Sequence, residues 1–258
     1  MHCRLCLNAG KLVKAHAIPE AFFRELREDS KAPIIISGSP SAFPKKAPIG
    51  VYDEGSLCDQ CEPKFAAIDD YGIQVLLKRL DELFIPVSGS AGVVAYQASG
   101  IDQEVLLRFL VATLWRAAVS TQTFYRRVEL GPYEDTARRV ILNPQSPLPA
   151  VFGAALSRWT VDEESQFKSG APMDPFREKW DGVNAYRLYL GEVVAYVRVD
   201  SQPFRSPLRE IALLAQNSTT LIARSLSKSK DMAAMARTAK ESHKYEKHRR
   251  ISRHAKSR

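Results

Sequence analysis

The four cysteines of the chain fall in two C-x-x-C pairs, Cys3 and Cys6 in CRLC and Cys58 and Cys61 in CDQC. Two such pairs can supply four thiolates to one tetrahedral Zn²⁺, because each short spacing forms a turn with both sulfurs on one side. Two disulfides are the rival interpretation, but MHCRLC carries no apolar signal segment, and a reducing compartment would keep the thiols free. A redox C-x-x-C would need one pair rather than two. We therefore predict a structural zinc site in a cytoplasmic protein.

One histidine, His16, lies inside the body of the chain, whereas His2 is near the N-terminus and the other three are in the basic C-terminal segment. It stands in KLVKAHAIPE, between an apolar run and Pro19, a residue that favours the start of a helix. Such a histidine can be packed in the core with its ring nitrogens satisfied, can bind a metal, or can act as a general base. A zinc ion with four thiolates would need no further ligand.

The pattern C-x-x-C … A-H-A-I-P-E-A … L-C-D-Q-C-E resembles the zinc-stapled form of the HNH (ββα-metal) endonuclease superfamily, over roughly the first 72 residues. In that form a C-x-x-C pair precedes an H-I-I-P segment, and a later L-C-x-x-C opens a helix. The resemblance implies an N-terminal treble-clef zinc module in which His16 is a partly exposed general base. It would activate water for attack on a phosphodiester of nucleic acid, with DNA the expected substrate, in phage defence or a mobile element.

The resemblance also implies a catalytic divalent cation, which would steady the leaving oxygen and the pentacovalent phosphate. Glu62 stands where the family usually has His or Asn at the start of the helix. Carboxylate oxygens suit Mg²⁺ or Mn²⁺, so Glu62 is the expected first ligand of that cation. The carboxylates that could join Glu62 are Asp53, our first choice, then Glu54 and Glu20. The predicted catalytic group is therefore His16, Glu62 and Asp53.

A non-catalytic interpretation competes with this one. Ala15 stands where the family often has an acidic metal ligand, and Glu62 could simply favour a helix N-terminus electrostatically. Asp69, seven residues after Glu62, could share its helix face or belong to a solvated surface. The alternative function is a zinc-stabilised nucleic-acid-binding or adaptor protein. A third possibility is a subunit that a protein partner activates.

The net charge of +8 is confined to the C-terminal segment. Residues 227–258 contain eleven Lys/Arg and three Asp/Glu, so the rest of the chain is formally neutral. A basic segment of this kind suits a polyanion, most often nucleic acid, although it can also serve solubility alone. The side chains predicted to contact phosphates are Arg249, Arg250 and Arg253 in this segment, and Lys45 and Lys46 in the proline-rich loop 31–50.

The elements that would position these residues follow from apolar spacing. A helix is predicted over 62–84, with Gly72 as a bend or break; a buried helix follows Asp102, a good N-cap; and another covers 133–142. Alternating apolar residues over 193–199 predict a β-hairpin whose turn contains Gly191. The charge-free stretch 84–101 contains Pro86 and three glycines, so we predict loop and buried strand there rather than a membrane span.

Together these features predict an α+β protein in three parts. Residues 1–80 form the treble-clef, or ββα-metal, zinc module. Residues 81–226 form a mixed domain of helices and a β-hairpin with a core of its own and an unknown role. Residues 227–258 form a basic helix, capped by Ser229, that frays into a disordered arm.

Overall fold

The computed structural model describes residues 2–25, 34–35, 45–47, 49–90, 92–160, 173–233 and 240. Its strands are β1 (Leu12–His16), β2 (Ile34–Ile35), β3 (Lys45–Lys46), β4 (Tyr52–Cys58), β5 (Ile85–Gly89), β6 (Gly92–Ala98), β7 (Phe152–Thr160), β8 (Phe176–Trp180), β9 (Val183–Leu190), β10 (Val193–Val199) and β11 (Thr219–Ser225). Its α-helices are α1 (Glu20–Arg24), α2 (Ala66–Ile73), α3 (Leu80–Leu83), α4 (Gln103–Val119), α5 (Glu134–Leu142) and α6 (Leu208–Ile211). Short 3₁₀ turns cover Glu62–Phe65, Thr123–Tyr125 and Gly131–Tyr133, and a π turn covers Gln74–Lys78.

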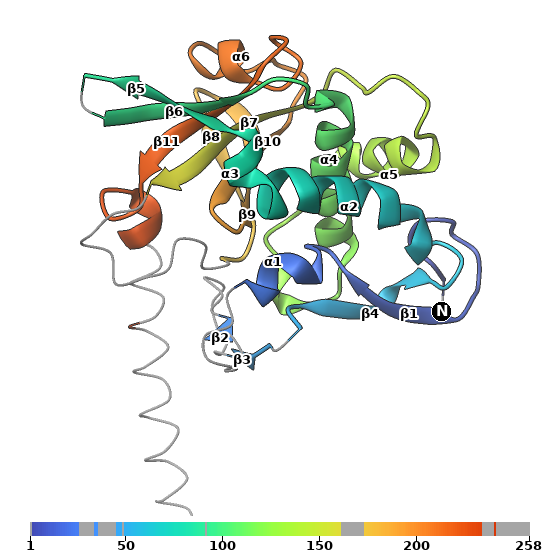
Figure 1. Cartoon of the computed structure of the whole chain (residues 1–258). Coiled ribbons are helices and arrows are strands. Elements are labelled where there is room, and N and C mark those ends of the chain that lie inside the picture. Colours follow the sequence, from blue (N-terminus) through green and yellow to red (C-terminus); the bar gives the residue numbers. More distant parts are fainter. Residues whose placement is uncertain are drawn as a thin grey trace, which may run out of the picture.

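A seven-stranded mixed sheet, in the order β5-β6-β11-β7-β10-β9-β8, forms the centre of the molecule (Figure 1). Every neighbouring pair in it is antiparallel except β11 and β7, which are parallel. The predicted hairpin is confirmed: β9 and β10 pair directly, and Gly191 occupies its turn with a φ of 65°, which glycine adopts without strain. The charge-free stretch forms β5 and β6, which confirms the strand prediction. The predicted burial was wrong, because β5 is exposed throughout and β6 along most of its length.

Helix α4 is the main buried helix, and it contacts α2 and α5 as well as β7 and β10. Its predicted cap is confirmed, since the Asp102 carboxylate accepts hydrogen bonds from the backbone N–H groups of Glu104 at 3.1 Å and Val105 at 3.0 Å. Nearly all of its residues are buried, including Trp115. A helix that is buried on all sides carries apolar residues on all sides, and the arginines that α4 also buries, Arg108 and Arg116, are paired with Glu104 and Asp69.

The predicted helix over 62–84 forms a helical run of a 3₁₀ turn, α2 and a π turn, which is interrupted at Arg79 (φ −115°, ψ 18°) before the short helix α3. The run passes through Gly72 without a break. A Cβ at this position would come within 2.5 Å of the Phe109 ring of α4. Gly72 therefore lets two helices approach closely, and the local irregularity falls instead on the π turn that follows it.

The largest hydrophobic core joins residues 1–80 to residues 81–226. Phe65, which ends the 3₁₀ turn after the second cysteine pair, stacks on Trp115 of α4 with ring centroids 6.3 Å apart. Phe22 of α1 stacks on Phe109 at the same centroid distance. The first eighty residues thus pack against the larger sheet through α4. Residues 81–226 also contain a cluster that includes no residue of 1–80, in which Phe176 and Trp180 pack against Trp159 and Tyr196, so the core predicted for this region is present beside the shared one.

The first turn of the predicted basic helix is present at residues 230–233, at the end of the described range 173–233. Ser229 caps it, with its Oγ accepting a hydrogen bond from the Met232 N–H at 3.1 Å. Residues 241–258 lie outside the described part of the chain. Among the helices of the described ranges, none has both the length and the apolar character needed to cross a bilayer.

Candidate metal centre and the histidine beside it

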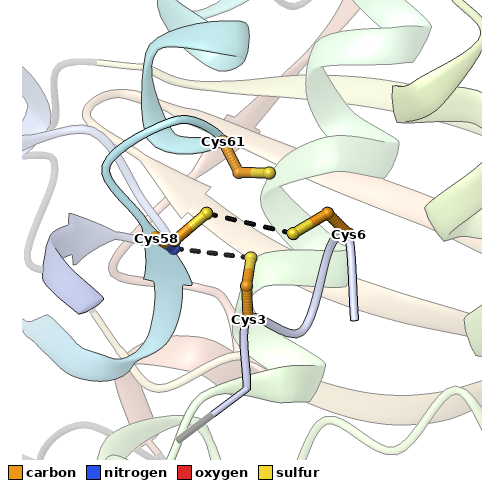
Figure 2. A group of neighbouring side chains, drawn as sticks. All are labelled: Cys3, Cys6, Cys58 and Cys61. Atoms are coloured by element: carbon orange, nitrogen blue, oxygen red, sulfur yellow. Dashed lines mark hydrogen bonds between the residues drawn. The ribbon is translucent and has the colours of Figure 1, made fainter. Parts of the chain in front are cut away.

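The four cysteines converge on one point between the N-terminal loop and the end of β4. Figure 2 shows their side chains turned toward one another, with Cys3 and Cys6 coming from the loop and Cys58 and Cys61 from the end of β4 and the turn after it. All four sulfurs lie within 4.8 Å of one another, and Cys6 Sγ and Cys58 Sγ are 3.9 Å apart. Tetrahedral zinc with bonds of about 2.3 Å would separate its sulfurs by about 3.8 Å. The cluster therefore fits one metal ion, and all four thiols are free of disulfides.

The local backbone favours negative charge on one of these sulfurs. The Cys58 N–H donates a hydrogen bond to Cys3 Sγ at 3.4 Å. Burial raises the pKa of Cys3, but backbone N–H donors outweigh it and lower that pKa to about 7. Burial and the hydrogen bonds from the other thiols instead raise the pKa of Cys61. A bound dication would remove this conflict, because metal ligation stabilises thiolates outright.

His16 is the last residue of β1, and its ring is half-buried beside the ribbon formed by β1 and β4. Its Nε2 lies 2.8 Å from the carbonyl oxygen of Ile49. A carbonyl can only accept, so Nε2 carries the proton and, in the neutral ring, Nδ1 carries the lone pair. Tyr52, the cross-strand partner of His16, meets the ring edge-on with centroids 6.1 Å apart.

The charges around His16 come from three different elements. Burial is the largest influence and lowers the pKa of His16 below its ordinary value of 6.5, and the positive charge of Arg116 in α4 acts in the same direction. The Ile49 carbonyl and the negative charges of Glu20 and Glu62 oppose them. The ring is therefore neutral at pH 7, with two carboxylates close enough to act on it. Glu20 begins α1 and Glu62 begins the 3₁₀ turn, and the charges of both reach the ring. That His16 and Glu62 act as one site stays a prediction.

Asp53 lies elsewhere, and this corrects the predicted catalytic group. It pairs with Ala15 in the register of β1 and β4, so its side chain is on the face of the ribbon opposite His16. The carboxylate is buried and accepts hydrogen bonds from Gly55 N at 2.7 Å, Ser120 Oγ at 2.8 Å, and both N–H and Oγ1 of Thr121. Both oxygens are thus used to join β4 to the end of α4. Of the carboxylates named from the sequence, Glu20 and Glu62 are the two whose charges raise the pKa of His16.

Two further side chains near His16 were not found from the sequence. Lys14 lies over the Tyr52 ring at 4.9 Å from its centroid and forms an ion pair of 3.7 Å with Glu54, which is exposed. Period-two alternation could have shown that Lys14 and His16 share a face of β1, and that Tyr52 and Glu54 share a face of β4. The pairing of the two strands, which is irregular between Val13 and Ala15, was needed to bring the two pairs together. Lys14 and Glu54 are exposed, whereas Tyr52 and His16 are half-buried, so together they form a partly exposed strip of a cation, an aromatic ring and the histidine.

Arg116 holds the start of α2 against α4. It donates two hydrogen bonds of 2.6 Å to the Asp69 carboxylate, and its guanidinium lies 4.5 Å from the centroid of the Phe65 ring. Asp69 was predicted either to share the helix face of Glu62 or to belong to a solvated surface, and it is instead half-buried in this ion pair. Because 47 residues separate the partners, no local pattern could have revealed the contact.

The predicted phosphate-contacting side chains lie outside what the structure describes. Lys45 and Lys46 form β3, paired with β2, but only their backbone is described. Arg249, Arg250 and Arg253 are beyond the described residues altogether. Their role in nucleic-acid binding stays a prediction.

Comparison of the chain with protein-family models, curated proteins and solved structures found no match. The resemblance to the HNH superfamily therefore rests on the residues of this chain alone.

Proposed function

We propose that this protein is a metal-dependent endonuclease of HNH type that hydrolyses phosphodiester bonds of nucleic acid, with DNA the expected substrate. The observation that carries the proposal is the state of His16. Its ring is neutral, its tautomer is set by the Ile49 carbonyl, and two carboxylates act on it from neighbouring helix starts. A general base that works near pH 7 needs these properties.

The zinc module would supply the frame for this chemistry. The order of elements is that of a treble clef. A knuckle with Cys3 and Cys6 comes first, the two-stranded ribbon of β1 and β4 follows, and a helical run begins at Glu62. We assign Zn²⁺ to the four thiolates because a closed set of four sulfurs is typical of structural zinc. The ion would tie the N-terminal loop to the start of the helical run, which holds Glu62 at a set place relative to His16.

In the proposed reaction, Nδ1 of His16 accepts a proton from water while the water oxygen attacks phosphorus. A Mg²⁺ or Mn²⁺ ion would stabilise the charge on the phosphate and on the leaving oxygen. Glu62 and Glu20 would hold that ion, with the substrate phosphate and water as its other ligands. Magnesium sites in phosphate-processing enzymes often use only one or two carboxylates in this way.

The substrate would lie along the strip that contains His16. Lys14 offers a positive charge for a phosphate, and Tyr52 offers an aromatic face for a base or sugar, both on the exposed face of the ribbon. The basic segment 227–258 would add affinity that does not depend on sequence.

A cleavage assay with Mg²⁺ or Mn²⁺ tests the proposal, with wild type compared with His16→Ala. His2→Ala is the matched control, since His2 is an exposed histidine in the same N-terminal part. We expect His16→Ala to lose cleavage while its zinc content, fold and nucleic-acid binding stay at wild-type values. Cleavage by His16→Ala at the wild-type rate would overturn the assignment of the base.

One observation favours the alternative of a non-catalytic nucleic-acid-binding or adaptor protein. In the part of the chain that the structure describes, the four cysteines are the one group of three or more His, Cys, Asp or Glu side chains whose ligand atoms lie within 4.8 Å of one another. The carboxylates near His16 are therefore not gathered into a protein-only cage. If the zinc-loaded protein binds nucleic acid but cleaves it with neither Mg²⁺ nor Mn²⁺, the non-catalytic alternative is the better account of its function.

A further inference from the structure

An ion-pair cluster far from the cysteines lies on the face of the central sheet that points away from α4. Residues of β9 and β10 such as Leu188 and Ala195 point into the core shared with α4, and their neighbours Tyr189 and Tyr196 point to the other face. There, Arg187 of β9 and Arg224 of β11 stand among aromatic rings contributed by four neighbouring strands. The guanidinium contacts are Arg224 over Trp159 at 4.8 Å and Tyr196 at 5.7 Å, and Arg187 over Tyr196 at 5.3 Å, Phe176 at 5.5 Å and Trp180 at 5.9 Å.

These groups converge on a single carboxylate that does not belong to the sheet. Asp231, in the first helical turn after Ser229, is 2% exposed. Its Oδ1 accepts hydrogen bonds from Arg187 Nη1 and from the Tyr189 hydroxyl at 2.8 Å, and its Oδ2 accepts one from Arg224 Nη2 at 2.9 Å. Two guanidiniums and a phenol around one anion form a receptor of the kind that proteins use for oxyanions.

The receptor has more donor capacity than a carboxylate can use. Arg224 Nη1 is buried, and no acceptor for it exists within the described residues. Arg187 is already held by Glu178 through two hydrogen bonds of 2.7 Å and 2.9 Å, so Asp231 is the acidic partner of Arg224. A phosphate group presents three oxygens and up to two negative charges, and it would satisfy the donor that the two oxygens of Asp231 leave unpaired.

We propose that Arg187, Tyr189 and Arg224 form a binding site for a phosphate group carried by a nucleotide or by the end of an oligonucleotide, and that Asp231 closes this site until such a ligand displaces it. Displacement would release the first turn of the basic segment from the sheet. The aromatic rings around the two arginines would then offer faces on which a base can stack. Phosphate binding would thus be coupled to the position of the segment that carries the net charge of the chain. The proposal is independent of catalysis at His16.

Asp231→Asn in the full-length chain tests the site, because it keeps the side-chain shape and removes the closing charge. Asp135→Asn is the control: it removes the same charge from an exposed cluster with Arg138 and Arg139. AMP is the probe, adenosine the phosphate-free counterpart, and 5′-phosphorylated and 5′-hydroxyl oligonucleotides of one sequence distinguish a nucleic-acid end from a free nucleotide. We expect Asp231→Asn to bind AMP at least tenfold more tightly than wild type or Asp135→Asn, and Arg224→Gln to cancel the gain.

A measurement on the wild-type chain covers the case in which Asp231→Asn fails to fold. Trypsin should cut after Lys228 and Lys230 faster as AMP is added, whereas adenosine should leave the rate unchanged. A preference for either oligonucleotide end in the same assay identifies the source of the phosphate. If AMP, inorganic phosphate and the phosphorylated oligonucleotide all leave the tryptic rate unchanged, or if folded Asp231→Asn binds AMP no better than the control, Asp231 is only a structural clamp and the proposal is wrong.

Discussion

Replacing Asp53 with alanine separates a structural from a catalytic role for this carboxylate. Its two oxygens accept hydrogen bonds from the backbone N–H groups of Gly55 and Thr121 and from the hydroxyls of Ser120 and Thr121. These bonds fasten β4, which ends at a metal-binding cysteine, to the end of the buried helix α4. Removal of the carboxylate leaves its donors without an acceptor in a site that is 4% exposed.

The expected decrease in the free energy of unfolding follows from counting the hydrogen-bond donors that cannot find another acceptor in Asp53→Ala. The two hydroxyls can rotate to other acceptors, whereas the two backbone N–H groups cannot. Each hydrogen bond to a charged acceptor contributes about 1.5–3 kcal/mol, so the two amides account for about 3–6 kcal/mol. The variant also recovers the desolvation cost of a buried charge, which places the net loss near the lower limit, about 3 kcal/mol. In a chain of this size that loss corresponds to a fall in melting temperature of roughly 6–12 °C.

Thermal and urea denaturation followed by circular dichroism measure the loss. Glu54→Ala is the matched control, because Glu54 is the next residue of the same strand and its ion pair with Lys14 is exposed. That variant should unfold at the wild-type midpoint, since exposed ion pairs contribute little. If Asp53→Ala is as stable as wild type and yet loses cleavage, the carboxylate acts on the substrate or its metal, and the structural account is refuted.

Three further predictions follow from the same structure. Purified protein should hold about one Zn²⁺ per chain, and metal analysis that finds no zinc would contradict the assignment. Cys3→Ser should lower both the zinc content and the melting temperature of the whole chain, because the largest core is shared between residues 1–80 and 81–226. The acid limb of kcat/KM should lie below pH 6.5, because burial lowers the pKa of His16 and protonation below that pKa removes the base. A pH–rate profile measures this, and an acid limb above pH 6.5 would exclude His16 as the general base. Deletion of residues 234–258, which leaves Asp231 in place, should weaken nucleic-acid binding and flatten its salt dependence without changing sequence preference; an unchanged salt slope in binding titrations would give the segment another role.

Several features were predictable because they depend on residues close together in the chain. The two C-x-x-C spacings indicated a cluster of four sulfurs, the position of Asp102 indicated a helix start, and alternation around Gly191 indicated a hairpin. Each is governed by the geometry of one turn or by the period of one element. The proposed closeness of His16 and Glu62 came from a family resemblance, and it agrees with the charges that act on the ring.

The side-chain partnerships depend instead on how distant elements pack. Asp53 is 67 residues from Ser120, Asp69 is 47 from Arg116, and Asp231 is 44 from Arg187. In each case the sequence predicts the helix or strand that carries the charged residue, but not which other element that residue contacts. The contact depends on how α4 and the C-terminal turn pack on the sheet. By itself the sequence therefore determined the metal-binding cysteines and the local elements. The tertiary structure alone decided that Asp53 supports the ribbon, that the charges of Glu20 and Glu62 both reach His16, and that two arginines of the sheet enclose Asp231. A buried charge lies where packing provides its partners.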